Sequence, residues 1–232
     1  MRIDVGPAAG QIQPMLYKEL NAAKLRVTID DIEPLIWRRL VAPLSWRLDE
    51  LHLTIQAAFN WWNSHLHEFR IGGLRYGDPD VEDMAFEDSP RLFDEREVKL
   101  RDFSREDGVK FTYAYDFGDN WRHTVEIEEL LAHDIEPRAA TCVGGARARP
   151  PEDVGGVSGY EAFLAIMADP RDPEHGDMKR WCGGHFDPEW FDLAIVDKNV
   201  RNALRANVRR RLHQPKPKQS GHAASGKRLR DQ

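Results

Sequence analysis

The segment from Tyr115 to His123 is the densest group of chemistry-bearing residues in the chain. It places Asp116 and Asp119 three residues apart, and His123 four residues further on, around a turn that contains glycine. Such a turn can bring two carboxylates and an imidazole to one point, as a metal site or an acid–base pair requires. The alternative is structural, because turn aspartates often accept hydrogen bonds from nearby backbone. Two acids and one histidine without a further donor favour the structural interpretation.

A second pair of acids, Glu152 and Asp153, follows two prolines and lies just before two glycines. The stiff Pro-Pro backbone restricts the directions in which these carboxylates can point. They could complete a cation site with the first group. They could instead receive Arg38 or Arg39 and staple their loop to the sheet through an arginine–carboxylate clamp. We favour the clamp.

The third candidate site contains His65 and His67, two positions apart. Histidines at this spacing on a strand face the same way and can chelate a metal ion. The tryptophans just before them favour packed positions at the edge of the core instead. We expect these two histidines to line a candidate binding cleft with Arg38, Arg39 and Trp121.

Several classes of site and protein are excluded by what the sequence lacks. Cys142 and Cys182 do not have the spacing of a zinc ribbon, and neither a Walker motif nor a GxGxxG loop occurs. No run approaches the roughly 18 apolar residues of a membrane helix, and the first residues lack the apolar core of a secretory signal. We therefore expect a cytoplasmic protein with no cofactor, no bound metal and no membrane contact, since two cysteines suit a reduced compartment.

Charge is unevenly distributed along the 232 residues. Residues 201–230 contain ten lysines and arginines and no acid; since the chain totals −6 and Asp231 adds one negative charge, residues 1–200 carry −15. A flexible basic arm attracts a polyanion, more weakly as salt rises, whereas an acidic body repels one. The alternative is a solvated tail, because the arm lacks aromatic residues to stack on bases. The candidate nucleic-acid contacts are Arg209, Arg210, Arg211, Lys216 and Lys218.

Apolar periodicity predicts the elements that position these groups. Strands are expected over 25–29, 34–41, 65–71, 109–117 and 122–130. Helices are expected over 48–60, 158–168, 174–182 and 190–211. The acidic segment 76–96 is expected to be a surface excursion, and the glycine- and proline-rich segment 137–159 an ordered loop.

These elements predict a single α+β domain: a mainly antiparallel β-sheet with one early helix and several C-terminal helices. The domain is expected over residues 16–211. A flexible lead-in over 1–15 precedes it, and a disordered basic tail over 212–232 follows it.

The chain contains, in this order, Trp37-Arg-Arg39, His65-Leu-His-Glu-Phe69, the Tyr115–His123 segment and Pro150-Pro-Glu-Asp153. This series of motifs resembles the plasmid pRiA4b ORF-3-like family, also labelled as TnpR-type passenger proteins of insertion elements. The resemblance covers roughly residues 16–205 and implies a cytoplasmic α+β protein of plasmids, mobile elements or chromosomes, without an established activity. Arg149 and Val154 stand where many members carry cysteines, so a thiolate metal site would be incomplete here.

Two functions follow from these observations. The first is a non-enzymatic binding or accessory module: its acidic body contacts an unknown protein partner, and its basic arm contacts nucleic acid weakly and without sequence specificity. The charge division and the lack of a complete catalytic set favour this function. The alternative is a hydrolase-like enzyme, with or without a metal ion, that uses Asp116, Asp119, His123, Glu152 and Asp153. If the five side chains line one cleft, the enzyme is favoured; if each has a structural partner, the binding module is.

Overall fold

The computed structural model describes residues 19–80, 91–104, 107–205 and 214. The expected lead-in over 1–15 lies outside the described residues. So does the expected basic tail over 212–232, apart from Gln214, and so do all five candidate nucleic-acid contacts, Arg209, Arg210, Arg211, Lys216 and Lys218. The description below therefore concerns the acidic body of the chain.

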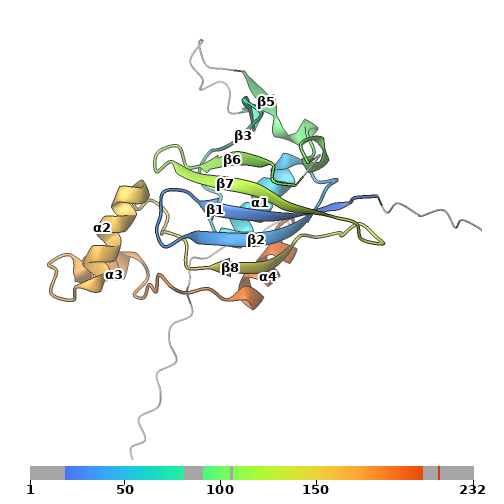
Figure 1. Ribbon diagram of the computed structural model, residues 1–232. Helices are drawn as coiled ribbons and strands as arrows, with labels where there is room; N and C mark the ends of the chain where they lie inside the picture. Colours follow the sequence, from blue (N-terminus) through green and yellow to red (C-terminus); the bar gives the residue numbers. More distant parts are fainter. Residues whose placement is uncertain (1–18, 81–90, 105–106, 206–213, 215–232) are drawn as a thin grey trace, which may run out of the picture.

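An eight-stranded sheet forms the centre of the described protein, in the order β5-β4-β3-β6-β7-β1-β2-β8 (Figure 1). Its strands are β1 (Ala22–Ile29), β2 (Ile36–Pro43), β3 (His67–Ile71), β4 (Leu74–Gly77), β5 (Leu92–Asp94), β6 (Lys110–Tyr115), β7 (Trp121–Leu131) and β8 (Thr141–Ala146). Neighbours are antiparallel, except β4 and β5, which are parallel. The predicted α+β class with a mainly antiparallel sheet is confirmed.

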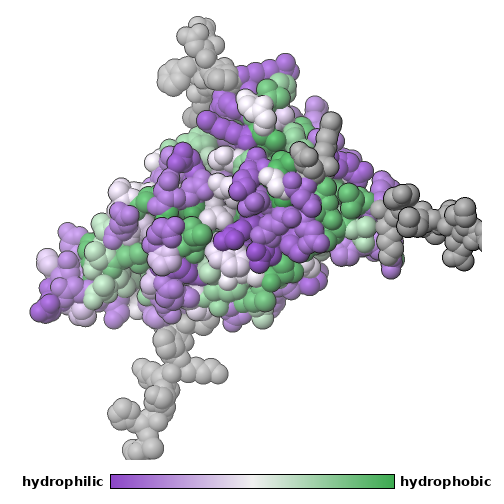
Figure 2. All heavy atoms as spheres, in the orientation of Figure 1, coloured by the Kyte–Doolittle hydropathy of each residue, from purple (hydrophilic) through white to green (hydrophobic). Residues whose placement is uncertain are grey.

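Alternation of side chains gives the sheet one buried face and one charged face. Leu25, Val27 and Ile29 of β1 are fully buried, as their spacing predicts. On the opposite face of the same strand, Lys24 forms an ion pair with Glu129. Figure 2 shows hydrophilic residues over much of the middle of this outer face. The core therefore lies on one side of the sheet.

The helices cover the buried face and one end of the sheet. α1 (Leu48–Phe59) and α4 (Leu193–Arg201) contact each other behind the sheet in the view of Figure 1. α2 (Gly156–Ala168) and α3 (His175–Trp181) lie together beyond the strand ends, at the left of that view. Short 3-10 turns, η2 (Glu95–Glu97) and η3 (Leu100–Asp102), follow β5. Among the described residues, no helix has the length and apolar composition of a membrane span.

The prediction of a loop over 137–159 is wrong where β8 pairs with β2. Glycines in this segment indicate a turn, but Gly144 and Gly145 lie within the strand. A Cβ at Gly145 would lie 2.6 Å from the ring of Phe191 and 2.9 Å from the side chain of Arg38. Glycine is present here because other side chains pack closely against the strand, which is a reason that sequence alone does not reveal.

Two further element predictions need correction. The expected surface excursion over 76–96 contains the end of β4 and all of β5, where Tyr76 and Phe93 pack with their ring centres 5.7 Å apart. Tyr76 also packs on Phe103, at 5.5 Å between ring centres, but these few aromatic residues are too widely spaced in the sequence to form a strand pattern. The last helix, expected over 190–211, begins at residue 193 and ends at residue 201, and the residues from 206 to 213 lie outside the described structure.

Candidate functional site

The β6–β7 turn holds Asp116 in a left-handed backbone conformation, with φ of 57°. Its Oδ1 accepts hydrogen bonds from the backbone N–H groups of Gly118 and Asp119, at 3.0 and 3.3 Å. These bonds stabilise the turn in the manner of an Asx turn. Its other oxygen, Oδ2, faces away from the turn and lies 3.6 Å from Nε2 of His65.

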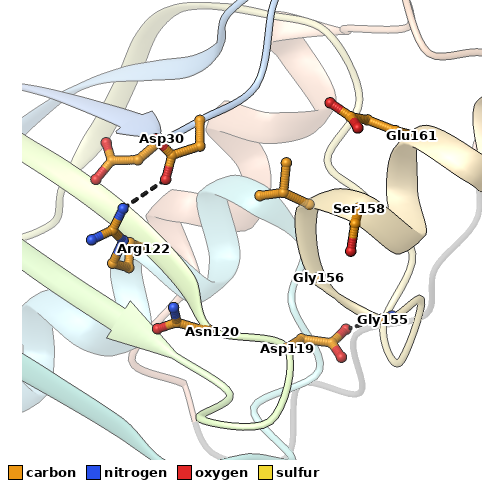
Figure 3. A pocket seen from close by; sticks show the side chains of 10 residues that line it. Asp30, Asp119, Asn120, Arg122, Gly155, Gly156, Ser158 and Glu161 are labelled. Atoms are coloured by element: carbon orange, nitrogen blue, oxygen red, sulfur yellow. Dashed lines mark hydrogen bonds and ion pairs between the residues drawn. The ribbon is translucent and has the colours of Figure 1, made fainter.

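Asp119 links the same turn to the beginning of α2. Its Oδ2 accepts a hydrogen bond of 3.2 Å from the N–H of Gly155, where a carboxylate is favoured by the helix dipole (Figure 3). A Cβ at Gly156 would lie only 2.6 Å from the carbonyl oxygen of Asp119, so the turn and the helix touch backbone to backbone. Four of the ten residues that line the adjoining hollow are acids, and its one arginine, Arg122, pairs with Asp31. The role of Asp119 is therefore structural.

The structure does not bring His123 to the carboxylates. The ring is fully buried on the core face of β7, and its Nδ1 lies 3.1 Å from the carbonyl oxygen of Trp121 and 3.3 Å from that of Tyr113. These contacts place the proton on Nδ1, so Nε2 accepts the indole N–H of Trp61 at 3.4 Å. Burial lowers the pKa of His123 to about 4. It is a neutral core histidine, and its predicted convergence with Asp116 and Asp119 is wrong.

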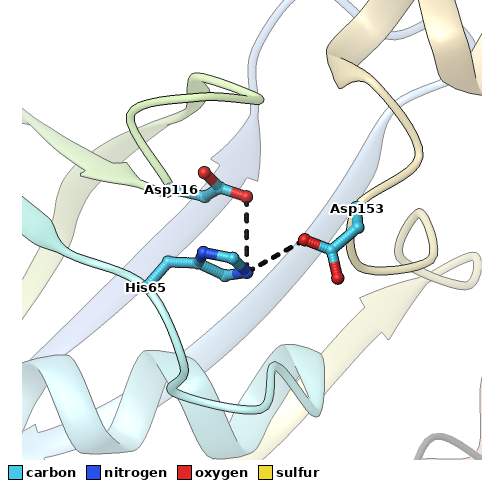
Figure 4. Close-up of side chains that lie close together, drawn as sticks. All are labelled: His65, Asp116 and Asp153. Carbon is cyan, nitrogen blue, oxygen red and sulfur yellow. Dashed lines mark ion pairs between the residues drawn. The ribbon is translucent and has the colours of Figure 1, made fainter.

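His65 takes the place expected for His123. Its Nε2 lies 3.2 Å from Oδ1 of Asp153, 3.6 Å from Oδ2 of Asp116 and 3.9 Å from Oε2 of Glu152. Figure 4 shows the imidazole between the two aspartates. The imidazole comes from the loop between α1 and β3, one aspartate from the β6–β7 turn, and the other acids from the loop after β8. We call His65, Asp116, Glu152 and Asp153 the acid cluster.

The two neighbouring acids of the cluster have different environments. The Glu152 side chain is 1% exposed, whereas that of Asp153 is 62% exposed. Glu152 accepts hydrogen bonds from the N–H of Trp62 at 2.5 Å and from the hydroxyl of Tyr115 at 3.4 Å. Burial raises the pKa of the Glu152 carboxyl, and the nearby Arg149 guanidinium opposes that rise. Glu152 therefore supports the cluster from inside, while Asp153 meets solvent.

The predicted arginine–carboxylate clamp is not formed as expected: the positive charge near Glu152 is that of Arg149, whose hydrogen bonds go to the carbonyl oxygens of Pro150 and Asn60. Arg149, not Arg38 or Arg39, lies beside Glu152: it stacks 4.5 Å above the ring of Trp61 and donates to the carbonyl oxygen of Asn60 at 3.0 Å. Burial lowers its pKa to about 10. Arg149 thus ties the loop after β8 to the C-terminal end of α1, where a positive charge is favoured.

Arg38 and Arg39 have other partners, so the prediction that one of them clamps Glu152 or Asp153 is wrong. The buried guanidinium of Arg38 donates to four carbonyl oxygens, at distances from 2.8 to 3.0 Å, and burial lowers its pKa to about 10. Arg39 points to the outer face of the sheet and forms a two-bonded ion pair with Glu128, at 2.6 and 2.8 Å.

The five residues expected to line a cleft do not do so together. Arg38 and Trp121 are buried, and Arg39 is on the outer face. Nε2 of His67 donates to Oε2 of Glu95 at 2.8 Å, and its ring stacks on that of His52 with centroids 3.4 Å apart, so it is a packed residue. Of the five, His65 alone belongs to the acid cluster.

Three exposed apolar side chains belong to the segments that hold the acid cluster, and sequence reasoning missed them. Trp62 is 47% exposed, Leu66 is 39% exposed and Phe117 is 53% exposed. Each belongs to a segment that holds the cluster: Trp62 donates its N–H to Glu152, the carbonyl of Leu66 accepts the N–H of Asp116, and Phe117 follows Asp116. We call these three side chains the apolar rim. Their positions next to the His65 and Asp116 motifs are the only signal that sequence offers.

The fold and the cluster define a class of α+β protein with an antiparallel sheet, one covered face and a polar cluster where three loops meet. The chain belongs to the plasmid pRiA4b ORF-3-like family, whose model matches residues 21–195 and so includes the cluster and the rim. The family resemblance noted from the motifs is confirmed.

Relatives of the chain share most of its length. The uncharacterised protein y4hQ of Sinorhizobium fredii is 40% identical over 184 residues, which are 78% of this chain and 91% of that protein. The crystal structure of a protein of unknown function, MM3350 from Methanosarcina mazei Go1, is 36% identical and superposes with a TM-score of 0.66, over 75% of this chain and 97% of that one. The architecture is therefore shared across these relatives.

Proposed function

We propose that the chain is a non-enzymatic binding or accessory module that docks a protein partner on the apolar rim. The observation that carries this proposal is the exposure of Trp62, Leu66 and Phe117 on the segments that hold the acid cluster. Aromatic side chains contribute much of the binding free energy at protein interfaces. Polar groups commonly lie at the rim of such contacts. The loops that carry the rim are held by hydrogen bonds, so the surface is ordered before a partner arrives.

The hydrogen bonds of the expected catalytic residues support a module more than a hydrolase. His123 is buried and neutral, and Asp119 caps α2, so neither is placed to transfer a proton to a substrate. Glu152 is directed into the protein interior by two hydrogen bonds. The hydrolase alternative retains only Asp116 and Asp153 of its five predicted residues.

The second part of the proposal is weak, non-specific contact with nucleic acid through the basic residues 201–230. It rests on the ten lysines and arginines of that segment and on the acidity of residues 1–200. Division of function between a protein-binding body and a basic arm suits an accessory role, because phosphate contacts add affinity without sequence preference.

Docking on the rim is tested with a cell lysate of the source organism and immobilised full-length protein. We expect one partner to be retained in proportion to the bait, and its retention to fall at least tenfold with Trp62→Ala or Phe117→Ala. Ile135→Ala is the control, because Ile135 is an even more exposed apolar residue that follows the end of β7 opposite the β6–β7 turn. Equal retention by all four baits contradicts the proposed surface.

Contact with nucleic acid is tested separately with the full chain and a chain that ends at Leu212. We expect the full chain to retard duplex DNA at low salt, less so as salt rises, and the shortened chain to lose most of that retardation. Equal behaviour of the two chains, or no retardation by either, contradicts this part of the proposal.

A further inference from the structure

Three donor atoms of the acid cluster have the spacing of metal ligands. Nε2 of His65, Oδ2 of Asp116 and Oδ1 of Asp153 all lie within 4.8 Å of one another, and the imidazole nitrogen is 3.6 and 3.2 Å from the two oxygens. Ligands that bind one ion at about 2.1 Å, at tetrahedral or octahedral angles, are roughly 3 to 3.5 Å apart. A single ion could therefore reach all three atoms after small side-chain rotations.

We propose that His65, Asp116 and Asp153 together bind one divalent transition-metal ion. The inference goes beyond the proposed function, because the apolar rim can dock a partner whether or not an ion is present. It differs from the cation site considered from the sequence, which joined Asp116, Glu152 and Asp153 to Asp119 and His123 and did not include His65.

The neighbours of the three ligands hold them in position. Two backbone N–H groups fix Oδ1 of Asp116, which leaves Oδ2 directed at the imidazole. Glu152 adds a third carboxylate behind the imidazole, 3.9 Å from Nε2 of His65. Buried groups of this kind orient the ligands of metal sites and strengthen their affinity. Three carboxylates face one imidazole and one buried guanidinium, that of Arg149, so the cluster has negative charge that a divalent cation would neutralise.

The donor set indicates the class of ion. An imidazole nitrogen with two carboxylate oxygens suits Zn²⁺, Mn²⁺, Fe²⁺ or Co²⁺, whereas Ca²⁺ and Mg²⁺ prefer oxygen ligands throughout. Three protein ligands leave at least one position for water. That position faces solvent, because the side chains of His65 and Asp153 are 29% and 62% exposed. The ion would join the loop after α1, the β6–β7 turn and the loop after β8.

Metal-free full-length protein is titrated with ZnCl₂ by calorimetry, and with CoCl₂ by visible absorbance. We expect one saturable site in the wild type, with the absorbance bands of a cobalt–imidazole site. Asp153→Asn is expected to weaken Zn²⁺ binding at least tenfold, and His65→Gln to abolish both the tight site and the cobalt bands. Both variants change exposed or half-exposed side chains, and unchanged thermal unfolding without metal confirms that each is folded.

His133→Gln is the matched control, since His133 is an exposed histidine beyond the opposite end of β7. We expect it to bind Zn²⁺ as the wild type does. The proposal is overturned if the wild type has no saturable site, which would mean that the carboxylates interact only with the His65 side chain. It is also overturned if His65→Gln and His133→Gln bind Zn²⁺ equally. Neither result affects docking on the rim, which Trp62→Ala and Phe117→Ala test.

Discussion

Replacing Arg38 by methionine removes a buried cation that holds three elements together. The guanidinium donates to the carbonyl oxygens of Trp37 in β2, Ala58 at the end of α1, and Ala146 and Arg147 at the end of β8. It also lies between the rings of Phe59 and Phe191, 4.9 and 4.8 Å from their centres. Methionine keeps much of the apolar stem and rotational freedom of the side chain, but it cannot donate a hydrogen bond.

The expected loss follows from the groups left without a partner. A hydrogen bond to a charged group contributes about 1.5–3 kcal/mol, and a buried carbonyl left unpaired costs about 1–3 kcal/mol. The substitution also removes the cost of keeping a charged guanidinium away from water, a cost reflected in the pKa of Arg38, which burial lowers to about 10. This gain offsets several kcal/mol of the lost hydrogen-bond energy. We therefore expect Arg38→Met to lose about 3–5 kcal/mol, because four carbonyl oxygens lose their donor and the released charge offsets only part of that cost.

The adjacent Arg39 is the matched control, because it has the same chemistry on the other face of the same strand. Its pair with Glu128 is partly exposed, and such pairs contribute only about 0–1 kcal/mol. Urea unfolding measures both losses, with m-values unchanged if both variants unfold in two states. A loss below about 1 kcal/mol for Arg38→Met, or equal losses for the two variants, refutes the argument that the buried carbonyls depend on Arg38.

Three further predictions concern His123, Gly156 and the adjacent acids Glu152 and Asp153. The pKa of His123 falls from 6.5 to about 4 on folding, so as pH drops through that interval the unfolded chain binds a proton before the folded protein does. The free energy of unfolding should therefore fall by up to about 3 kcal/mol between pH 6.5 and 4. Urea midpoints should fall less steeply over this range for His123→Phe, and equal slopes for wild type and variant contradict a buried, neutral His123. Gly156→Ala should unfold at a lower temperature than Gly108→Ala: both glycines have positive φ, but a Cβ meets a backbone oxygen at 2.6 Å in the first and nothing within 4 Å in the second; equal melting temperatures contradict the close contact. Glu152→Ala should lose about 2–4 kcal/mol in urea, because it leaves the buried Arg149 guanidinium without a nearby negative charge and the N–H of Trp62 without its acceptor. Asp153→Asn should lose under about 0.5 kcal/mol, because the side chain is exposed and asparagine tolerates the left-handed backbone of this position; similar losses for the two variants contradict the difference in burial.

Much of the fold could be predicted because the sheet has one buried face. Alternation in β1, β2, β6 and β7 marks each strand at near its true position, and the spacing of apolar residues marks α1. β8 escaped prediction because it is an edge strand with two glycines, whose small size serves the packing of Phe191 and Arg38. Sequence shows that a glycine is present, but not whether a turn or a close neighbour requires it.

The candidate site was predicted in part, and the errors have one physical cause. Convergence of Asp116 and Asp153 was the alternative to the favoured structural roles, and their oxygens lie within 4.8 Å of each other and of His65. The sequence predicted that His65 and His67 lie on one strand with their rings on the same face. β3 begins only at His67, so His65 lies in the preceding loop and the two rings diverge. The contact of His65 with Asp116 depends on the β3–β6 register, in which His67 pairs with Tyr115. Register between strands separated by 38 residues cannot be derived from either strand alone.

At this end of the sheet, one residue of each neighbouring pair packs inward and holds the loops, and the other faces solvent. Glu152 is directed inward and Asp153 outward; His67 packs on His52 while His65 reaches the surface. A left-handed backbone at Asp153, with φ of 57°, makes the first reversal possible within one residue. The arrangement means that an exposed member can change without loss of the fold, whereas its inner neighbour cannot. A ligand of the outer groups, whether an ion or a partner, would therefore meet a surface whose geometry is fixed from beneath.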